Sequence, residues 1–116
     1  MFRKKPLTQV YQYDIFESVI LTGKSALDDF KKKHPNARKA LSQWQSVIEK
    51  NSFKDFTALR AVFPSVDYVK NSPYTVFDIR GNRYRVAVIV VYRDNRCIVE
   101  RVMTHEEYDR WGRTLK

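Results

Sequence analysis

The chain has 116 residues, 43% hydrophobic and 14% aromatic, which is enough apolar material for one core and excludes a disordered tail. Its longest apolar run, Val86–Val91, is far shorter than the ~20 residues that cross a bilayer. The single Cys97 cannot form an internal disulfide, and no apolar stretch follows the basic residues near the start, as a secretory signal requires. We therefore expect a cytoplasmic protein with no membrane partner, in which Cys97 is a buried hydrophobe rather than a nucleophile.

The net charge of +9 makes a polyanion the first candidate partner. Nucleic acid ranks before an acidic protein, and an anionic membrane surface ranks third. Of the 11 arginines, 8 follow Ile79, whereas 10 of the 11 lysines precede it. Arginine can hold a phosphate through two hydrogen bonds, while lysine is a hydrated point charge. A phosphate site is therefore expected in the last third of the chain.

The N-terminal part of the chain is predicted to contain an extension and a short strand. Residues 1–16 are polar and irregular, and we expect them to form an extension that lacks fixed structure in the isolated protein. Residues 17–116 are expected to form a single domain. Its first element is a short strand over residues 17–21.

Helices are predicted next. Ser25 is expected to cap a helix in which Asp28 completes a loose capping box, and Pro35 ends that helix near His34. A second helix over residues 36–50 follows from apolar residues at helical spacing. This stripe, which we assign to the core, comprises Ala37, Ala40, Leu41, Trp44, Val47 and Ile48. Asp55 is expected to start one further helical turn.

Three strands in an antiparallel meander are predicted for residues 74–80, 83–92 and 97–104. The links Gly81-Asn82 and Asp94-Asn95 consist of residue types that tolerate positive φ, which favours tight hairpins. Thr104 is the natural cap of a short last helix. The expected fold is an α+β two-layer domain, with an N-terminal strand and two helices packed on an antiparallel sheet.

Arginines crowd the central predicted strand and its neighbours. Arg83 and Arg85 alternate with Tyr84 and are expected to point the same way. Two interpretations stay open at this point. The arginines form either a solvated face with cross-strand ion pairs to Asp78 or Glu100, or a basic face that binds a phosphate backbone. Tyr84 can stack on a base if it is exposed, although packing is its simpler use.

His105 follows a strand, precedes a helix and has Glu106, Glu107 and Tyr108 beside it. Histidine can take and give a proton near neutral pH, but a histidine at a strand end is often a structural hydrogen-bond partner. His34 is most simply a cap at a helix C-terminus. These two histidines show no metal-ligand spacing, so no metal is expected.

Three segments carry a resemblance to a known family. Residues 58–67, the block Gly81-Asn82-Arg83-Tyr84-Arg85-Val86 and the block Thr104-His105-Glu106-Glu107-Tyr108-Asp109 resemble the HigB toxins of bacterial type II toxin–antitoxin systems, within the RelE-like superfamily. The resemblance covers about residues 19–109. Two departures are the extension over residues 1–16 and Met103, where many relatives have a small residue.

The resemblance implies a RelE-like fold and an activity. Such toxins are small basic endoribonucleases that cut mRNA, usually on translating ribosomes, and need no metal or cofactor. A helix-turn-helix antitoxin, HigA-like, silences them, and the complex binds operator DNA. Cleavage proceeds through attack of the ribose 2′-OH on the adjacent phosphate.

The resemblance also implies roles for individual residues. Arg85 and Arg83 would neutralise charge in the transition state, His105 would be the general base or acid, and Tyr108 would position the phosphate or assist proton transfer. The residues expected to hold the RNA are Arg101, Lys70, Lys54, Arg80 and Tyr84. Two alternatives remain: a non-catalytic nucleic-acid-binding domain, and a toxin of the same fold that acts on DNA gyrase without needing His105.

Overall fold

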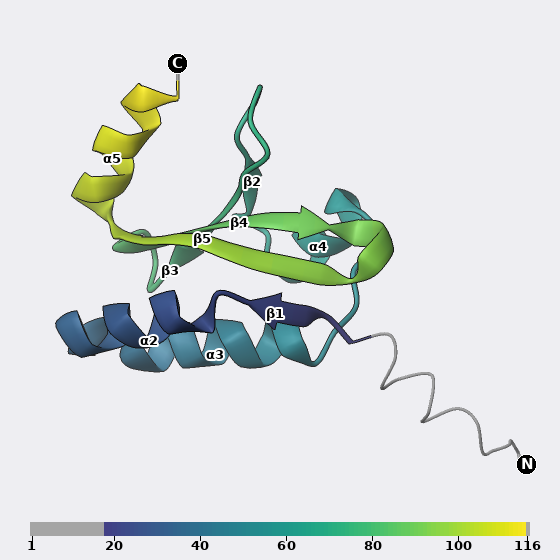
Figure 1. Ribbon diagram of the computed structural model, residues 1–116, viewed down its shortest axis with the longest axis horizontal. Coiled ribbons are helices and arrows are strands. Elements are labelled where there is room, and N and C mark those ends of the chain that lie inside the picture. The colour runs from purple at the N-terminus through teal and green to yellow at the C-terminus, as the bar shows by residue number, and fades with distance from the viewer. Residues whose placement is uncertain (1–17, 116) are drawn as a thin grey trace, which may run out of the picture.

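The computed structural model describes residues 18–115 and shows the α+β architecture that the sequence predicts (Figure 1). A mixed sheet of five strands has helices α2 and α3 on one face and helix α5 on the other. The predicted extension over residues 1–16 lies outside the described residues. The elements are β1 (Ile20–Thr22), α2 (Lys24–Lys33), η1 (Pro35–Ala37), α3 (Arg38–Glu49), α4 (Phe56–Val62), β2 (Asp67–Tyr68), β3 (Thr75–Ile79), β4 (Tyr84–Val91), η2 (Tyr92–Asp94), β5 (Arg96–Thr104) and α5 (His105–Thr114).

The strand order is β1-β5-β4-β3-β2, which confirms the predicted meander β3-β4-β5. The prediction of a purely antiparallel sheet is wrong, because one of the strand pairs is parallel. Strand β1 pairs with β5 in parallel, with Ile20 opposite Arg96 and Thr22 opposite Ile98. Strand β2, which was not predicted, pairs antiparallel with β3 at the other edge. Turn residues reveal hairpins between neighbouring strands, whereas the partner of β1 depends on a contact between distant parts of the chain.

The core lies between the sheet and the helices α2 and α3. Trp44 on α3 meets Phe77 on β3 with ring centroids 5.2 Å apart, and Val86 of the central strand is fully buried. Four of the six residues predicted as a core stripe are buried there, and Ala40 packs against them, whereas Val47 is only half-buried. The buried four are Ala37, Leu41, Trp44 and Ile48. A second, smaller cluster lies under α5 on the opposite face and consists of Val76, Ala87, Met103 and Trp111.

The predicted cap of the first helix is wrong. Helix α2 begins at Lys24, so its N-cap residue is Gly23, which has a φ of 81°. Ser25 lies inside the helix and cannot be its cap. The chain needs this left-handed glycine to turn from β1 into α2 directly beside Val99 of β5. Asp28 consequently lies outside the first turn. The cap predicted at Asp55 is confirmed, since its Oδ1 accepts a hydrogen bond of 2.9 Å from the backbone N–H of Ala58.

The hairpin between β3 and β4 is one residue longer on each side than predicted. Residues 80–83 form the link, with positive φ at Arg80 (54°) and Gly81 (68°) rather than at Asn82. Strand β4 therefore begins at Tyr84, which leaves Arg83 in the turn.

In residues 18–115, no helix has both the length and the hydrophobicity required to cross a bilayer.

Replacing Gly23 with alanine is expected to destabilise the fold more than the same change at Gly81. Both glycines have positive φ, which costs an alanine about 1–2 kcal/mol. A Cβ on Gly23 would lie 2.6 Å from the carbonyl oxygen of Val99, whereas nothing lies within 4 Å of one on Gly81. Overpacking therefore adds about 1–3 kcal/mol for Gly23→Ala. Urea unfolding monitored by circular dichroism measures both losses, and equal losses would contradict the close contact.

Candidate active site

A surface pocket of about 400 Å³ lies where the β3–β4 turn meets the start of α5 and the end of α2. Pockets of this size are large enough for a small ligand. Two of the predicted catalytic residues, Arg83 and His105, line it together. The complete lining is His34, Asn82, Arg83, Tyr84, Thr104, His105 and Glu106.

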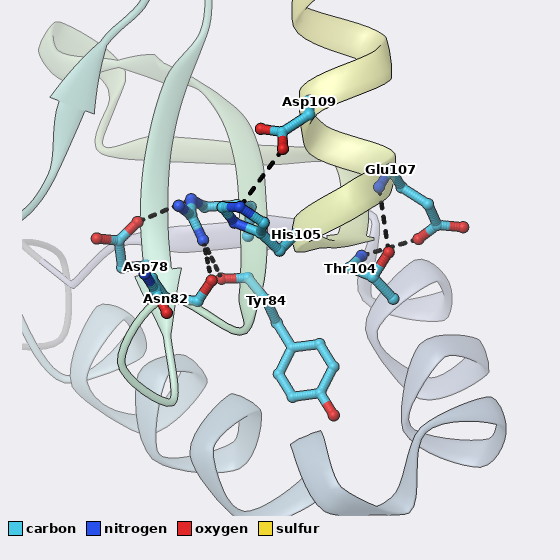
Figure 2. Close-up of polar contacts among 8 residues, drawn as sticks. Asp78, Asn82, Tyr84, Thr104, His105, Glu107 and Asp109 are labelled. Atoms are coloured by element: carbon cyan, nitrogen blue, oxygen red, sulfur yellow. Dashed lines mark hydrogen bonds and ion pairs between the residues drawn. The ribbon is translucent and has the colours of Figure 1, made fainter.

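Hydrogen bonds at the start of α5 fix the position of His105. The predicted cap at Thr104 is confirmed as a full capping box: its Oγ1 accepts from the N–H of Glu107 at 3.2 Å, and Glu107 Oε1 accepts from the N–H of Thr104 at 2.8 Å (Figure 2). The backbone N–H of His105 donates to the carbonyl of Arg83 at 3.0 Å. The first turn of α5 is therefore attached directly to the β3–β4 turn.

The carboxylate that faces His105 belongs to Asp109, one helical turn later. His105 Nε2 lies 3.4 Å from Asp109 Oδ2, and both side chains are about half exposed (Figure 2). Sequence reasoning named Glu106 and Glu107 as neighbours, but the side chain of Glu107 belongs to the capping box. The i,i+4 spacing of His105 and Asp109 was the signal that could have identified this partner.

Arg85 occupies a different environment from Arg83, which lies in the turn before β4 and lines the pocket. Its side chain is only 12% exposed, and its Nε lies 2.9 Å from Asp78 Oδ1. Its Nη1 donates to the carbonyl oxygen of Asn82, and its guanidinium lies 5.1 Å from the ring centre of Tyr108. For Arg85, the structure therefore shows the ion pair with Asp78 that was one of the two interpretations.

The two sides of strand β4 explain why Arg85 lies near α5, whereas Tyr84 faces α2. Tyr84 points away from α5 (Figure 2) and packs against Phe30 of α2, with ring centroids 5.6 Å apart. Because side chains alternate along a strand, the next residue, Arg85, lies on the α5 side. Tyr84 is only 9% exposed, so of its two proposed uses the structure shows packing.

Tyr108 packs beside Arg85 rather than in the pocket. Burial raises the pKa of the Tyr108 hydroxyl; Arg85 opposes this shift, while the carboxylates of Asp67, Asp78 and Asp109 add to it. The hydroxyl is therefore protonated at neutral pH, so Tyr108 can donate a hydrogen bond but cannot act as a base.

The predicted RNA-holding residues are spread over the surface. Arg101 on β5 lies with its guanidinium 5.4 Å from the ring centre of Trp111 and lines a groove of about 580 Å³ between α2, β5 and α5. Arg80 is exposed in the β3–β4 turn. Lys54 precedes α4 and Lys70 follows β2, and both are exposed. Apart from Tyr84, none of these residues lines the pocket that holds His105.

Neither a metal centre nor a reactive thiol is found in the described part of the chain. Within residues 18–115, no three side chains among His, Cys, Asp and Glu form a group that could hold a metal ion. Cys97 is 2% exposed, and burial raises the pKa of its thiol to about 12. Its predicted place as a buried hydrophobe is confirmed.

Comparison with known proteins relates the chain to one family. Residues 37–111 match the family described as HigB toxin, the RelE-like toxic component of a toxin–antitoxin system. The mRNA interferase toxin HigB of Escherichia coli strain K12 is 38% identical over 90 residues, covering 77% of this chain and 86% of that protein. The mRNA interferase HigB of E. coli O6:H1 is 29% identical over 94 residues, covering 80% of this chain and 91% of that protein.

Arg85→Ala is expected to lower the free energy of unfolding by about 1–3 kcal/mol, because it removes a charged, largely buried hydrogen-bond donor. The matched change Arg83→Ala, at an exposed turn residue, should cost at most about 0.5 kcal/mol. Chemical denaturation of both variants provides the measurement. Unchanged stability of the Arg85 variant would mean that its contacts to Asp78 and Asn82 contribute nothing to the fold.

Cys97 is expected to resist alkylation in the folded protein. At pH 8 its raised pKa and its burial should make the reaction with iodoacetamide at least about 100-fold slower than in the urea-unfolded chain. Mass spectrometry over time measures both rates. Rapid modification of the folded protein would show that the thiol is accessible.

Proposed function

The chain belongs to the HigB toxin family, and we propose on this premise that it is an endoribonuclease that cleaves mRNA. The observation that carries the proposal is the pocket in which His105 and Arg83 meet at the start of α5. A proton-transfer group beside a guanidinium is what phosphodiester cleavage requires. The net charge of +9 favours a polyanionic substrate.

The proposed reaction is attack of a ribose 2′-OH on the adjacent phosphate. The 2′-oxygen loses its proton and bonds to phosphorus, the bond to the 5′-oxygen breaks, and that oxygen receives a proton. His105, oriented by Asp109 at 3.4 Å, serves as the base or the acid of this exchange. Arg83 on the rim of the pocket stabilises the negative charge that builds up on the phosphate oxygens. No step requires a metal ion.

We assign Arg85 and Tyr108 to the same site, in supporting roles. Arg85 holds the carbonyl of Asn82, and Asn82 and Arg83 line the pocket, so Arg85 fixes the turn that carries the site. Its charge also contributes to the positive potential near the phosphate. Tyr108 lies outside the pocket beside Arg85, and we propose that its protonated hydroxyl donates a hydrogen bond to RNA that extends past the pocket, which helps to position the phosphate.

The surrounding basic residues are proposed to hold the RNA on either side of the cleaved bond. They act mainly through phosphate contacts, which position a strand without reading its sequence. The proposed residues are Arg101, Lys70, Lys54 and Arg80. Tyr84, which is packed against α2, contributes only the edge that it presents to the pocket.

Family membership also supports a set of partners. We propose that the toxin acts in the cytoplasm on mRNA that is being translated on ribosomes. A helix-turn-helix antitoxin would form the inhibitory complex, and that complex would bind operator DNA. A non-catalytic nucleic-acid-binding domain or an inhibitor of DNA gyrase would not need His105. Substitution of His105 therefore distinguishes these two alternatives from a ribonuclease.

His105→Ala and Arg83→Ala are each expected to lower mRNA cleavage by about 100-fold or more, since proton transfer and transition-state charge stabilisation each contribute that much. Primer extension on a defined mRNA, with purified protein and translating ribosomes, measures the cleavage. Lys39→Ala, which removes an exposed positive charge from α3 outside the pocket, is the control and should cleave normally. Intact mRNA under conditions in which the protein still arrests growth would contradict the ribonuclease assignment.

A further inference from the structure

The chain contains two histidines, and the structure brings both to the same pocket. His105 comes from the start of α5, and His34 comes from the end of α2, far away in the sequence. Sequence reasoning treated His34 only as a helix cap. The fold places it with Arg83 and His105 around one space of about 400 Å³.

The contacts of His34 leave its ring nitrogens unused. Its backbone N–H donates to the carbonyl of Phe30 at 2.8 Å, so the main chain alone closes the helix. Its imidazole stacks on the ring of Phe30, with centroids 4.3 Å apart and planes 28° apart, and lies 6.0 Å from the ring of Tyr84. Within residues 18–115, no protein group forms a hydrogen bond or ion pair with either imidazole nitrogen.

Cleavage through the 2′-OH requires two proton transfers on opposite sides of phosphorus. One group takes the proton from the attacking 2′-oxygen, and another gives a proton to the departing 5′-oxygen, which leaves on the far side. A single imidazole at one edge of the pocket cannot reach both oxygens in an in-line displacement. The lining of the pocket includes a second imidazole, that of His34 at the C-terminal end of α2.

We propose that His34 is the second proton-transfer group of the ribonuclease and acts across the scissile phosphate from His105, an inference that rests on the proposed function. One histidine accepts the 2′-OH proton as the 2′-oxygen–phosphorus bond forms. The other, protonated at the start, donates its proton as the phosphorus–5′-oxygen bond breaks. The products are a 2′,3′-cyclic phosphate and a 5′-OH, and the pair returns to its starting state by exchanging protons with water.

A purely structural role for His34 would depend on its flat ring against Phe30, not on its nitrogens. The variant His34→Phe keeps an aromatic ring at this position and removes the proton. It should retain the melting temperature of the wild type but cleave mRNA about 100-fold or more slowly. Cleavage at the wild-type rate would overturn the proposal.

A substrate with sulfur in place of the bridging 5′-oxygen tests the chemistry directly, because a thiolate leaves without being protonated. An mRNA carrying one such linkage at the cleavage site should restore cleavage in one of the two variants His34→Phe and His105→Phe, namely the one that lacks the general acid. Rescue of either variant, with the other still impaired, supports the pair; rescue of neither, or of both, overturns it. A failure of the proposed function would look different, since the wild-type protein would then leave ordinary mRNA intact.

Discussion

The backbone hydrogen bond from His105 to the carbonyl of Arg83 is the contact on which the candidate site depends. It joins the first turn of α5 to the turn between β3 and β4, two segments that are distant in the sequence. The capping box of Thr104 and Glu107 fixes where α5 begins, and the hydrogen bond fixes where that beginning lies. Without both, a histidine at the end of a strand and an arginine in a hairpin would have no common pocket.

The alternation of side chains along β4 places neighbouring residues on opposite sides of the sheet near this contact. Tyr84 points toward α2 and lines the pocket together with His34, whereas Arg85 lies on the α5 side with Asp78 and Tyr108. The hydrogen bond from Arg85 to the carbonyl of Asn82 links the two sides, because Asn82 lies in the turn that lines the pocket. A partly buried ion pair on one face of the strand thus supports an exposed site at its end.

Sequence reasoning succeeded where the signal was local. The cap at Thr104, the cap at Asp55 and the buried stripe of α3 follow from residue type and spacing alone. It failed where distant segments decide. Ser25 looked like a helix cap, but the helix begins after Gly23 because the chain must pass close to Val99 of β5. The parallel pairing of β1 with β5 could not be predicted from turn residues, because no turn joins these two strands.

The sequence by itself determined the α+β class, the basic charge, the family and the histidine at the start of the last helix, since composition, periodicity and motifs are local properties. The tertiary structure decided which residues share the pocket. It separated Arg85 from Arg83, because the hairpin turn extends one residue further and β4 begins at Tyr84. It also brought His34 into the same pocket as His105, because α2 packs along β5 and ends beside the β3–β4 turn, a neighbourhood created only when the core closes.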